Sequence, residues 1–134
     1  MKQSIKMVLC CLSLLASVSS VAWAEPAPEQ LRQTISDYIA NQERLHGAFG
    51  ILDERKGSLR QLALVRVHER VGKTGDYYYS CTDMTDVQTG DLLDLDFDIA
   101  DRGDKLEVVD IRIHKDNGNP RYTYDDNDNM IPLP

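Results

Sequence analysis

The chain has only three cysteines, too few for a framework of disulfide bonds. Cys10 and Cys11 stand in the first apolar run, which leaves Cys81 alone in the rest of the chain. One cysteine cannot form an internal disulfide, so the fold must be held by its core. Because Cys81 falls in the middle of a predicted strand, we expect it to be buried and inert, like a small hydrophobic residue.

The sequence also lacks the short motifs of several enzyme classes. It contains no glycine-rich phosphate loop, no G-x-S-x-G nucleophile elbow and no H-E-x-x-H helix. The three histidines, His46, His68 and His114, lie far apart in the chain. None has a second histidine or cysteine at ligand spacing, so the sequence does not predict a zinc site.

Positive charge is scarce, because 15 lysines and arginines face 22 aspartates and glutamates, for a net charge of −7. An acidic surface repels phosphate backbones and anionic lipid headgroups. We therefore expect no binding to nucleic acid or to a membrane surface. The same charge suits solubility, cations or basic partners.

No apolar run is long enough to anchor the chain in a bilayer, since residues 7–15 form the longest one. Two lysines precede this run, and Ala22-Trp23-Ala24 follows it as an A-x-A cleavage site. This order predicts a secretory signal peptide over residues 1–24 and a short linker over residues 25–28. We expect a periplasmic or secreted protein without a stable membrane anchor.

The next segment has helical periodicity. Over residues 29–46 apolar side chains recur every three or four positions, and Gly47 stands where a helix would end. After Gly47 the period changes to two, which predicts strands. The expected strands cover residues 48–54, 59–71, 76–87, 92–100 and 106–115, with a short edge strand over 121–124.

Tight turns join these strands without intervening helices, which favours antiparallel pairing. We expect a single α+β domain over residues 29–124. One N-terminal amphipathic helix would pack on a curved four- to five-stranded antiparallel sheet. Residues 125–134 would form an acidic, loosely ordered C-terminal tail.

This element order, with the runs LDLDF at residues 93–97 and IHKDNGNPRY at residues 113–122, resembles small exported bacterial proteins of unknown function. The fold implied is a cystatin-like or NTF2-like α+β roll. Because a single helix precedes the sheet, the cystatin-like variant is favoured. The resemblance implies a secreted domain whose curved sheet can bind a ligand, and it transfers no catalytic residue.

Charged side chains alternate with apolar ones in the last two long predicted strands. Pairing across the turn at Arg102-Gly103 would bring both sets of charges together on the face away from the helix. Two interpretations stay open: a solvent-exposed face whose charges fix the strand register, or a ligand-binding surface. The run Tyr77-Tyr78-Tyr79 adds Tyr78 as a further residue that could contact a partner. The candidate ligand-binding residues are Asp94, Asp96, Asp98, Arg112, His114 and Tyr78.

The tail carries oxygen ligands at alternate positions, Asp125, Asn127 and Asn129, as Ca²⁺ prefers. The glycine of an EF-hand loop is absent, since Met130 occupies its position, so this is not an EF-hand. A calcium site in the tail stays an alternative, and no other cofactor is expected.

We expect a non-enzymatic exported binding or accessory domain. Its ligand would be an unknown protein or small molecule, and a homodimer stays open. One alternative is a small NTF2-like enzyme that uses Asp96 with His114 as general base and partner. The other alternative is an acidic calcium-binding protein.

Overall fold

The structure, a computed structural model, describes residues 24–134. The predicted signal peptide lies outside these residues except for Ala24. Among the residues described, no helix combines the length and apolar character needed to cross a membrane.

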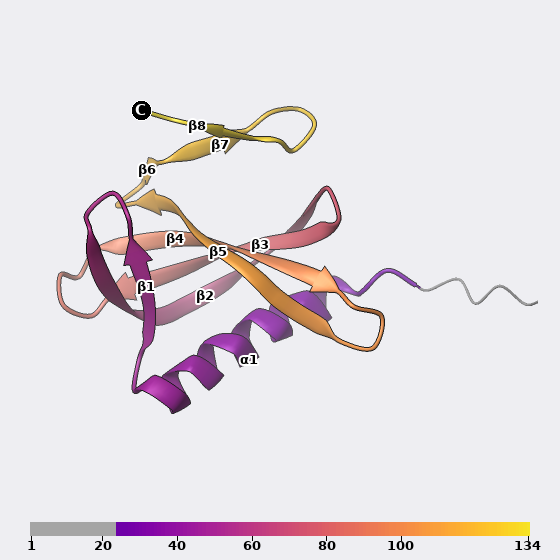
Figure 1. The fold of residues 1–134 in the computed structure, drawn as a ribbon, viewed down its shortest axis with the longest axis horizontal. Helices are drawn as coiled ribbons and strands as arrows, with labels where there is room; N and C mark the ends of the chain where they lie inside the picture. Colours follow the sequence, from indigo (N-terminus) through magenta and orange to yellow (C-terminus); the bar gives the residue numbers. More distant parts are fainter. Residues whose placement is uncertain (1–23) are drawn as a thin grey trace, which may run out of the picture.

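One helix is followed only by strands within this part of the chain (Figure 1). Six strands form one antiparallel sheet in the order β1-β2-β3-β4-β5-β6, and β7 pairs with β8 in a separate hairpin. The α+β class is therefore confirmed, but the main sheet has six strands where four to five were expected. The elements are α1 (Pro28–His46), β1 (Phe49–Asp53), β2 (Ser58–Thr74), β3 (Tyr77–Asp86), β4 (Leu92–Asp101), β5 (Leu106–Asp116), β6 (Asn119–Pro120), β7 (Tyr122–Tyr124) and β8 (Met130–Pro132).

Local chemistry sets both ends of α1. Pro28 occupies the first turn, where its missing N–H is not needed, and the Gln30 side chain accepts a hydrogen bond from the Ala27 N–H at 2.9 Å. At the other end Gly47 has φ of +82°, and its N–H donates to the Glu43 carbonyl. That left-handed conformation stops the helix and favours glycine.

The apolar face of α1 packs against the main sheet and forms the core. The helix contacts β1, β2, β3 and β5, so the sheet curves around it. Tyr38, Phe49 and Phe97 meet at ring-centroid distances of 6.0 to 6.5 Å. The core residues are Leu31, Ile35, Ile39, Phe49, Leu62, Met84, Leu93, Leu95, Phe97, Ile99 and Ile113.

The β7–β8 hairpin lies on the side of the main sheet away from α1 (Figure 1). The expectation of a loosely ordered tail over residues 125–134 is therefore wrong, and residues 121–124 leave the main sheet to pair with β8. Asp125 holds the turn, since its Oδ1 accepts the backbone N–H groups of Asn127 and Asn129. Arg55 adds hydrogen bonds to the carbonyls of Arg121 and Leu133.

The hairpin also changes the environment of the aspartates on β4. They point away from α1, as the alternation predicts, but they are not exposed. Asp94 is 8% exposed, Asp96 is 0% and Asp98 is 9%. Of the two interpretations of this face, the solvent-exposed one is wrong, because the hairpin covers the face and turns it into a second, polar interior.

Candidate functional site

Asp96 is the centre of the polar interior. Its Oδ2 accepts hydrogen bonds from the hydroxyls of Tyr122, at 2.6 Å, and Tyr124, at 2.8 Å. Burial raises the pKa of both hydroxyls most, and Asp96 raises it further through its charge and its hydrogen bonds, so both hydroxyls remain donors. The two tyrosines lie on β7, so these bonds attach the hairpin to the middle of the sheet.

The second oxygen of Asp96 faces Cys81, on the neighbouring strand β3. The thiol donates to Asp96 Oδ1, with 2.7 Å between Sγ and Oδ1. Burial, and then this hydrogen bond, raises the pKa of the Cys81 thiol. A protonated thiol is a poor nucleophile. Cys81 is half-buried and hydrogen-bonded rather than a purely hydrophobic residue, and its low reactivity stays a prediction.

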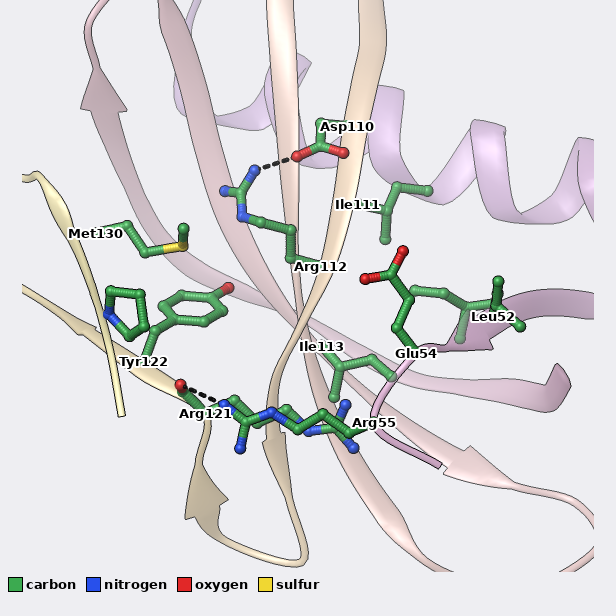
Figure 2. Close-up of a pocket in the computed structure, with 12 residues that line it drawn as sticks. Leu52, Glu54, Arg55, Asp110, Ile111, Arg112, Ile113, Arg121, Tyr122 and Met130 are labelled. Atoms are coloured by element: carbon green, nitrogen blue, oxygen red, sulfur yellow. Dashed lines mark hydrogen bonds and ion pairs between the residues drawn. The ribbon is translucent and has the colours of Figure 1, made fainter. Parts of the chain in front are cut away.

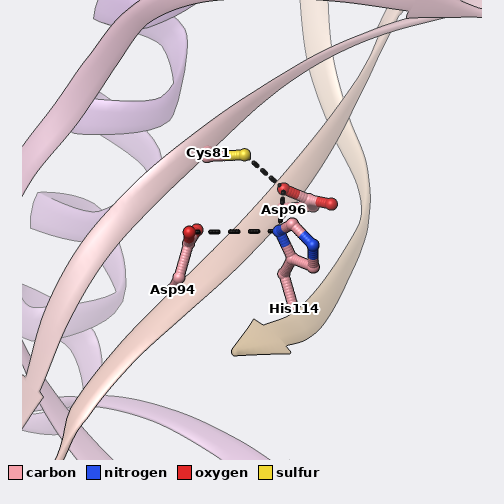
Figure 3. A group of neighbouring side chains, drawn as sticks. All are labelled: Cys81, Asp94, Asp96 and His114. Atoms are coloured by element: carbon pink, nitrogen blue, oxygen red, sulfur yellow. Dashed lines mark hydrogen bonds and ion pairs between the residues drawn. The ribbon is translucent and has the colours of Figure 1, made fainter. Parts of the chain in front are cut away.

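His114, on β5, completes the group (Figure 3). Its Nδ1 lies 3.9 Å from Asp94 Oδ2 and 3.9 Å from Asp96 Oδ1, beyond hydrogen-bond distance. The imidazole stacks on the Tyr122 ring, with 4.7 Å between centroids. His114 Nδ1 and Asp94 Oδ1 are both buried and lack a hydrogen-bond partner in the structure. Such atoms are costly to bury, and so require an explanation.

Three of these residues line a pocket between the main sheet and the hairpin, which we call the hairpin pocket. Its volume is about 410 Å³. Cys81, Asp94 and His114 line it, and side chains of both charges surround them. The lining residues are His68, Arg70, Tyr79, Cys81, Asp94, His114, Lys115, Thr123, Tyr124, Asp125 and Asp128.

His68 extends the polar interior along β2. Its Nε2 lies 2.9 Å from Asp83 Oδ1, and Arg66 donates to Asp83 Oδ2 at 2.8 Å. Burial alone would raise the pKa of Asp83, but the hydrogen bonds from Arg66 and His68 outweigh it and lower that pKa. Both carboxylate oxygens of Asp83 therefore already have partners.

Asp98 and Arg112 form a separate pair. Arg112 donates to both oxygens of Asp98, at 2.7 and 2.8 Å, and also contacts Asp110. Arg112 belongs to a second pocket, of about 410 Å³, which we call the edge groove (Figure 2). This groove runs between β1, β5 and the hairpin. Its lining residues are Ile51, Leu52, Glu54, Arg55, Asp110, Ile111, Arg112, Ile113, Arg121, Tyr122, Met130 and Pro132.

The remaining candidates lie elsewhere. Tyr78 packs against the apolar core, on the other side of the sheet, with Lys73 Nζ 4.9 Å from its ring centroid. Asn127 and Asn129 are exposed in the hairpin turn and donate backbone N–H groups to Asp125. Because Asp125 caps its own turn, these three residues do not form a loop of converging oxygen ligands. The structure thus brings together Asp94, Asp96 and His114, but not the whole predicted set.

An ion-pair cluster at the end of the sheet has no counterpart among the sequence predictions. Buried Arg60 contacts Asp53, Asp86 and Asp91. Arg121, just before β7, donates to both oxygens of Asp53 at 2.8 Å. This cluster attaches the base of the hairpin to β1.

Two residues of the site were missed in the sequence although a signal exists. Tyr122 and Tyr124 alternate around Thr123, which places both hydroxyls on one face of a short strand. The sequence prediction places both in a short edge strand over residues 121–124 and does not pair them with the aspartates.

Comparison with protein-family models, with curated proteins and with solved structures finds no match to this chain. The function must therefore be argued from the site itself.

Proposed function

We propose that this chain is an exported, non-enzymatic binding domain whose ligand enters the hairpin pocket. One observation carries the proposal: Asp94 and His114 line the pocket, and each has a buried polar atom, Oδ1 and Nδ1, without a hydrogen-bond partner. Ligand pockets combine a shaped cavity with a few converging polar groups. A ligand that satisfies these two atoms would relieve their cost of burial.

The rim of the pocket supports a small, polar ligand. Arg70 and Lys115 bring positive charge to it, while Asp125 and Asp128 bring negative charge. The Asp96 contacts hold Tyr124 in place at the pocket wall. A pocket of this kind selects by charge and hydrogen bonding rather than by apolar area.

The contacts give less support to the alternative of an Asp/His enzyme. Asp96 is fully buried, and its Oδ2 is occupied by two tyrosine hydroxyls. His114 Nδ1 lies 3.9 Å from Asp96, too far for the hydrogen bond that would orient a general base. The calcium alternative likewise lacks a converging set of oxygen ligands in the tail.

The fold family also remains a proposal. A single N-terminal helix enclosed by a curved antiparallel sheet supports the cystatin-like or NTF2-like roll of small exported bacterial proteins. The two-stranded hairpin over the far face is an addition to that plan. A fold of this kind does not identify the ligand.

The test is thermal unfolding of the protein, purified after expression of the full chain, with zinc sulfate, glycine, citrate or inorganic phosphate. At about 100 times its Kd, a ligand stabilises the folded state by about 2.7 kcal/mol. We expect at least one probe to raise Tm in the wild type and in Asp104→Asn, an exposed control, but not in Asp94→Asn. No shift with any probe, or an equal shift in Asp94→Asn, would overturn the proposal.

A further inference from the structure

We propose that Cys81, Asp94, Asp96 and His114 bind one divalent transition-metal ion of the zinc class. The inference rests on the proposed function, because it names the ligand class of the hairpin pocket. It also reverses the expectation from the sequence, where the spacing of histidines and cysteines gave no zinc motif. Three neighbouring strands bring the four residues together instead.

The geometry fits a single ion. One ligand atom from each of the four residues lies within 4.8 Å of the others. Tetrahedral zinc, with bonds of about 2.0 to 2.3 Å, separates its ligand atoms by roughly 3.3 to 3.8 Å. The two His114–carboxylate distances of 3.9 Å are close to this range. Cys81 and Asp96, now 2.7 Å apart around the thiol proton, would separate when an ion replaces that proton.

Two buried atoms without hydrogen-bond partners are a second, separate argument for an ion. Asp94 is 8% exposed, yet its Oδ1 has no hydrogen-bond donor. His114 Nδ1 is buried and also lacks a partner. A cation bound by Asp94 and His114 through these atoms would satisfy both of them. The hairpin pocket supplies the way in, since Cys81, Asp94 and His114 all line it.

Asp96 has the surroundings of a metal ligand. Its Oδ2 accepts the hydroxyls of Tyr122 and Tyr124, which leaves Oδ1 directed at the thiol and the imidazole. Outer hydrogen bonds of this kind hold ligating carboxylates in place. The tyrosines of the hairpin would thus orient the ligand.

The donor set selects the class of metal. Thiolate, imidazole and carboxylate together suit zinc and chemically similar ions such as cobalt(II), whereas calcium and magnesium prefer oxygen ligands only. The Cys81 thiol would release its proton to solvent as the ion binds. Lys115 Nζ, 3.7 Å from Asp94 Oδ2, would offset part of the excess negative charge. The neighbouring group of His68, Asp83 and Asp94 is a weaker candidate, because Asp83 is already paired.

The experiment is a titration of the untagged protein with cobalt(II), followed by displacement with zinc. We expect one equivalent of cobalt to give the near-ultraviolet charge-transfer band of a thiolate ligand and the visible bands of a tetrahedral site. Zinc should abolish both. Saturable binding without a thiolate band, or no saturable binding, would overturn the inference even if every variant failed to fold.

Matched variants assign the ligands. His114→Gln and Asp94→Asn should lose the cobalt spectrum, while His46→Gln and Asp104→Asn, both exposed, should keep it. Tyr122→Phe should weaken zinc binding roughly tenfold through the orientation of Asp96. An unchanged cobalt spectrum in folded His114→Gln would contradict the site.

The metal inference and the proposed function fail separately. If citrate, glycine or phosphate stabilises the protein through Asp94 but the metals do not bind, the metal inference is wrong and the pocket proposal stands. If zinc binds equally well to folded Asp94→Asn, as it would through the acidic turn, the metal site is wrong. The pocket proposal then also falls unless another probe depends on Asp94.

Discussion

Strand β4 has two buried faces, and they are buried in different ways. On one face Leu93, Leu95, Phe97 and Ile99 pack under α1, and all four are fully buried. On the other face Asp94, Asp96 and Asp98 are also buried, and Asp96 bonds to the β7–β8 hairpin. The hairpin lies on the side of the main sheet away from α1 (Figure 1). The same ten residues therefore belong to an apolar core and to a polar interior.

The two interiors differ in the interactions that stabilise them. Apolar packing is non-directional, so the helix side is filled by side chains of suitable shape. The hairpin side depends on directional contacts, and each buried polar atom without a partner destabilises the fold. Both oxygens of Asp98 accept from Arg112, although the Arg112 Nε has no partner. Asp94 Oδ1 and His114 Nδ1 are buried without any hydrogen-bond partner. We connect these two unpartnered atoms with ligand binding.

The largest expected effect breaks the apolar side. Phe97→Ala should lower the free energy of unfolding by about 3 to 5 kcal/mol, because it removes a fully buried ring between Tyr38 and Phe49. Urea unfolding measures this loss. Val65→Ala, at an exposed position, should change stability by less than about 0.5 kcal/mol. Similar losses for both variants would contradict the assignment of the core.

A smaller effect is expected on the polar side. Tyr122→Phe removes one hydrogen bond to the Asp96 carboxylate and should cost about 1.5 to 3 kcal/mol. The exposed Tyr77→Phe serves as the control. Urea unfolding measures both variants, and Tyr77→Phe should keep wild-type stability. If Tyr122→Phe is also as stable as the wild type, the hydrogen bond to Asp96 does not stabilise the hairpin.

Acid should loosen the attachment of the hairpin. The hydrogen bond from Arg121 lowers the pKa of Asp53 from 3.8 to about 2, against the opposing effect of burial. The unfolded chain binds this proton more tightly, so the stabilisation is present above pH 3.8 and is lost as the pH falls through about 2. It amounts to roughly 2 kcal/mol.

The measurement is urea unfolding of the wild type and of Asp53→Asn between about pH 5 and pH 2. This range spans the pKa values of Asp53 in the unfolded and the folded chain. The wild type should lose more stability than the variant across this range. Equal slopes would mean that the pairing of Asp53 with Arg121 contributes nothing to the folded state.

Local patterns were enough to predict the helix and the long strands. Apolar spacing places α1, and alternation in residues 92–100 places the aspartates opposite the core. Strand register was harder, because β2 departs from regular pairing twice, between Leu64 and Arg66 and between Val67 and Val71. Irregularities of this kind depend on the curvature of the whole sheet rather than on local residues.

The candidate site could be predicted only in part, since its key contacts join distant segments. Alternation identified Asp94, Asp96 and His114, but their burial depends on tyrosines 26 and 28 residues beyond Asp96. The Arg60 cluster was missed for the same reason. Its charged residues lie in strands or turns where the sequence alone predicts exposure, and only the folded sheet brings them together. The Arg60 cluster leaves no local periodic signal, and the alternation of Tyr122 and Tyr124 does not by itself show that they meet Asp96.

The hairpin covers the aspartate face, and the half-buried Cys81 thiol lies against Asp96. The most direct measurement is the rate of thiol labelling at neutral pH in the full chain with Cys10→Ser and Cys11→Ser, which leaves Cys81 as the single thiol. We predict labelling far slower in the folded protein than in the urea-unfolded chain, because the thiol is half-buried and donates a hydrogen bond to Asp96. Labelling at the rate of the unfolded chain would show that the folded protein does not protect Cys81.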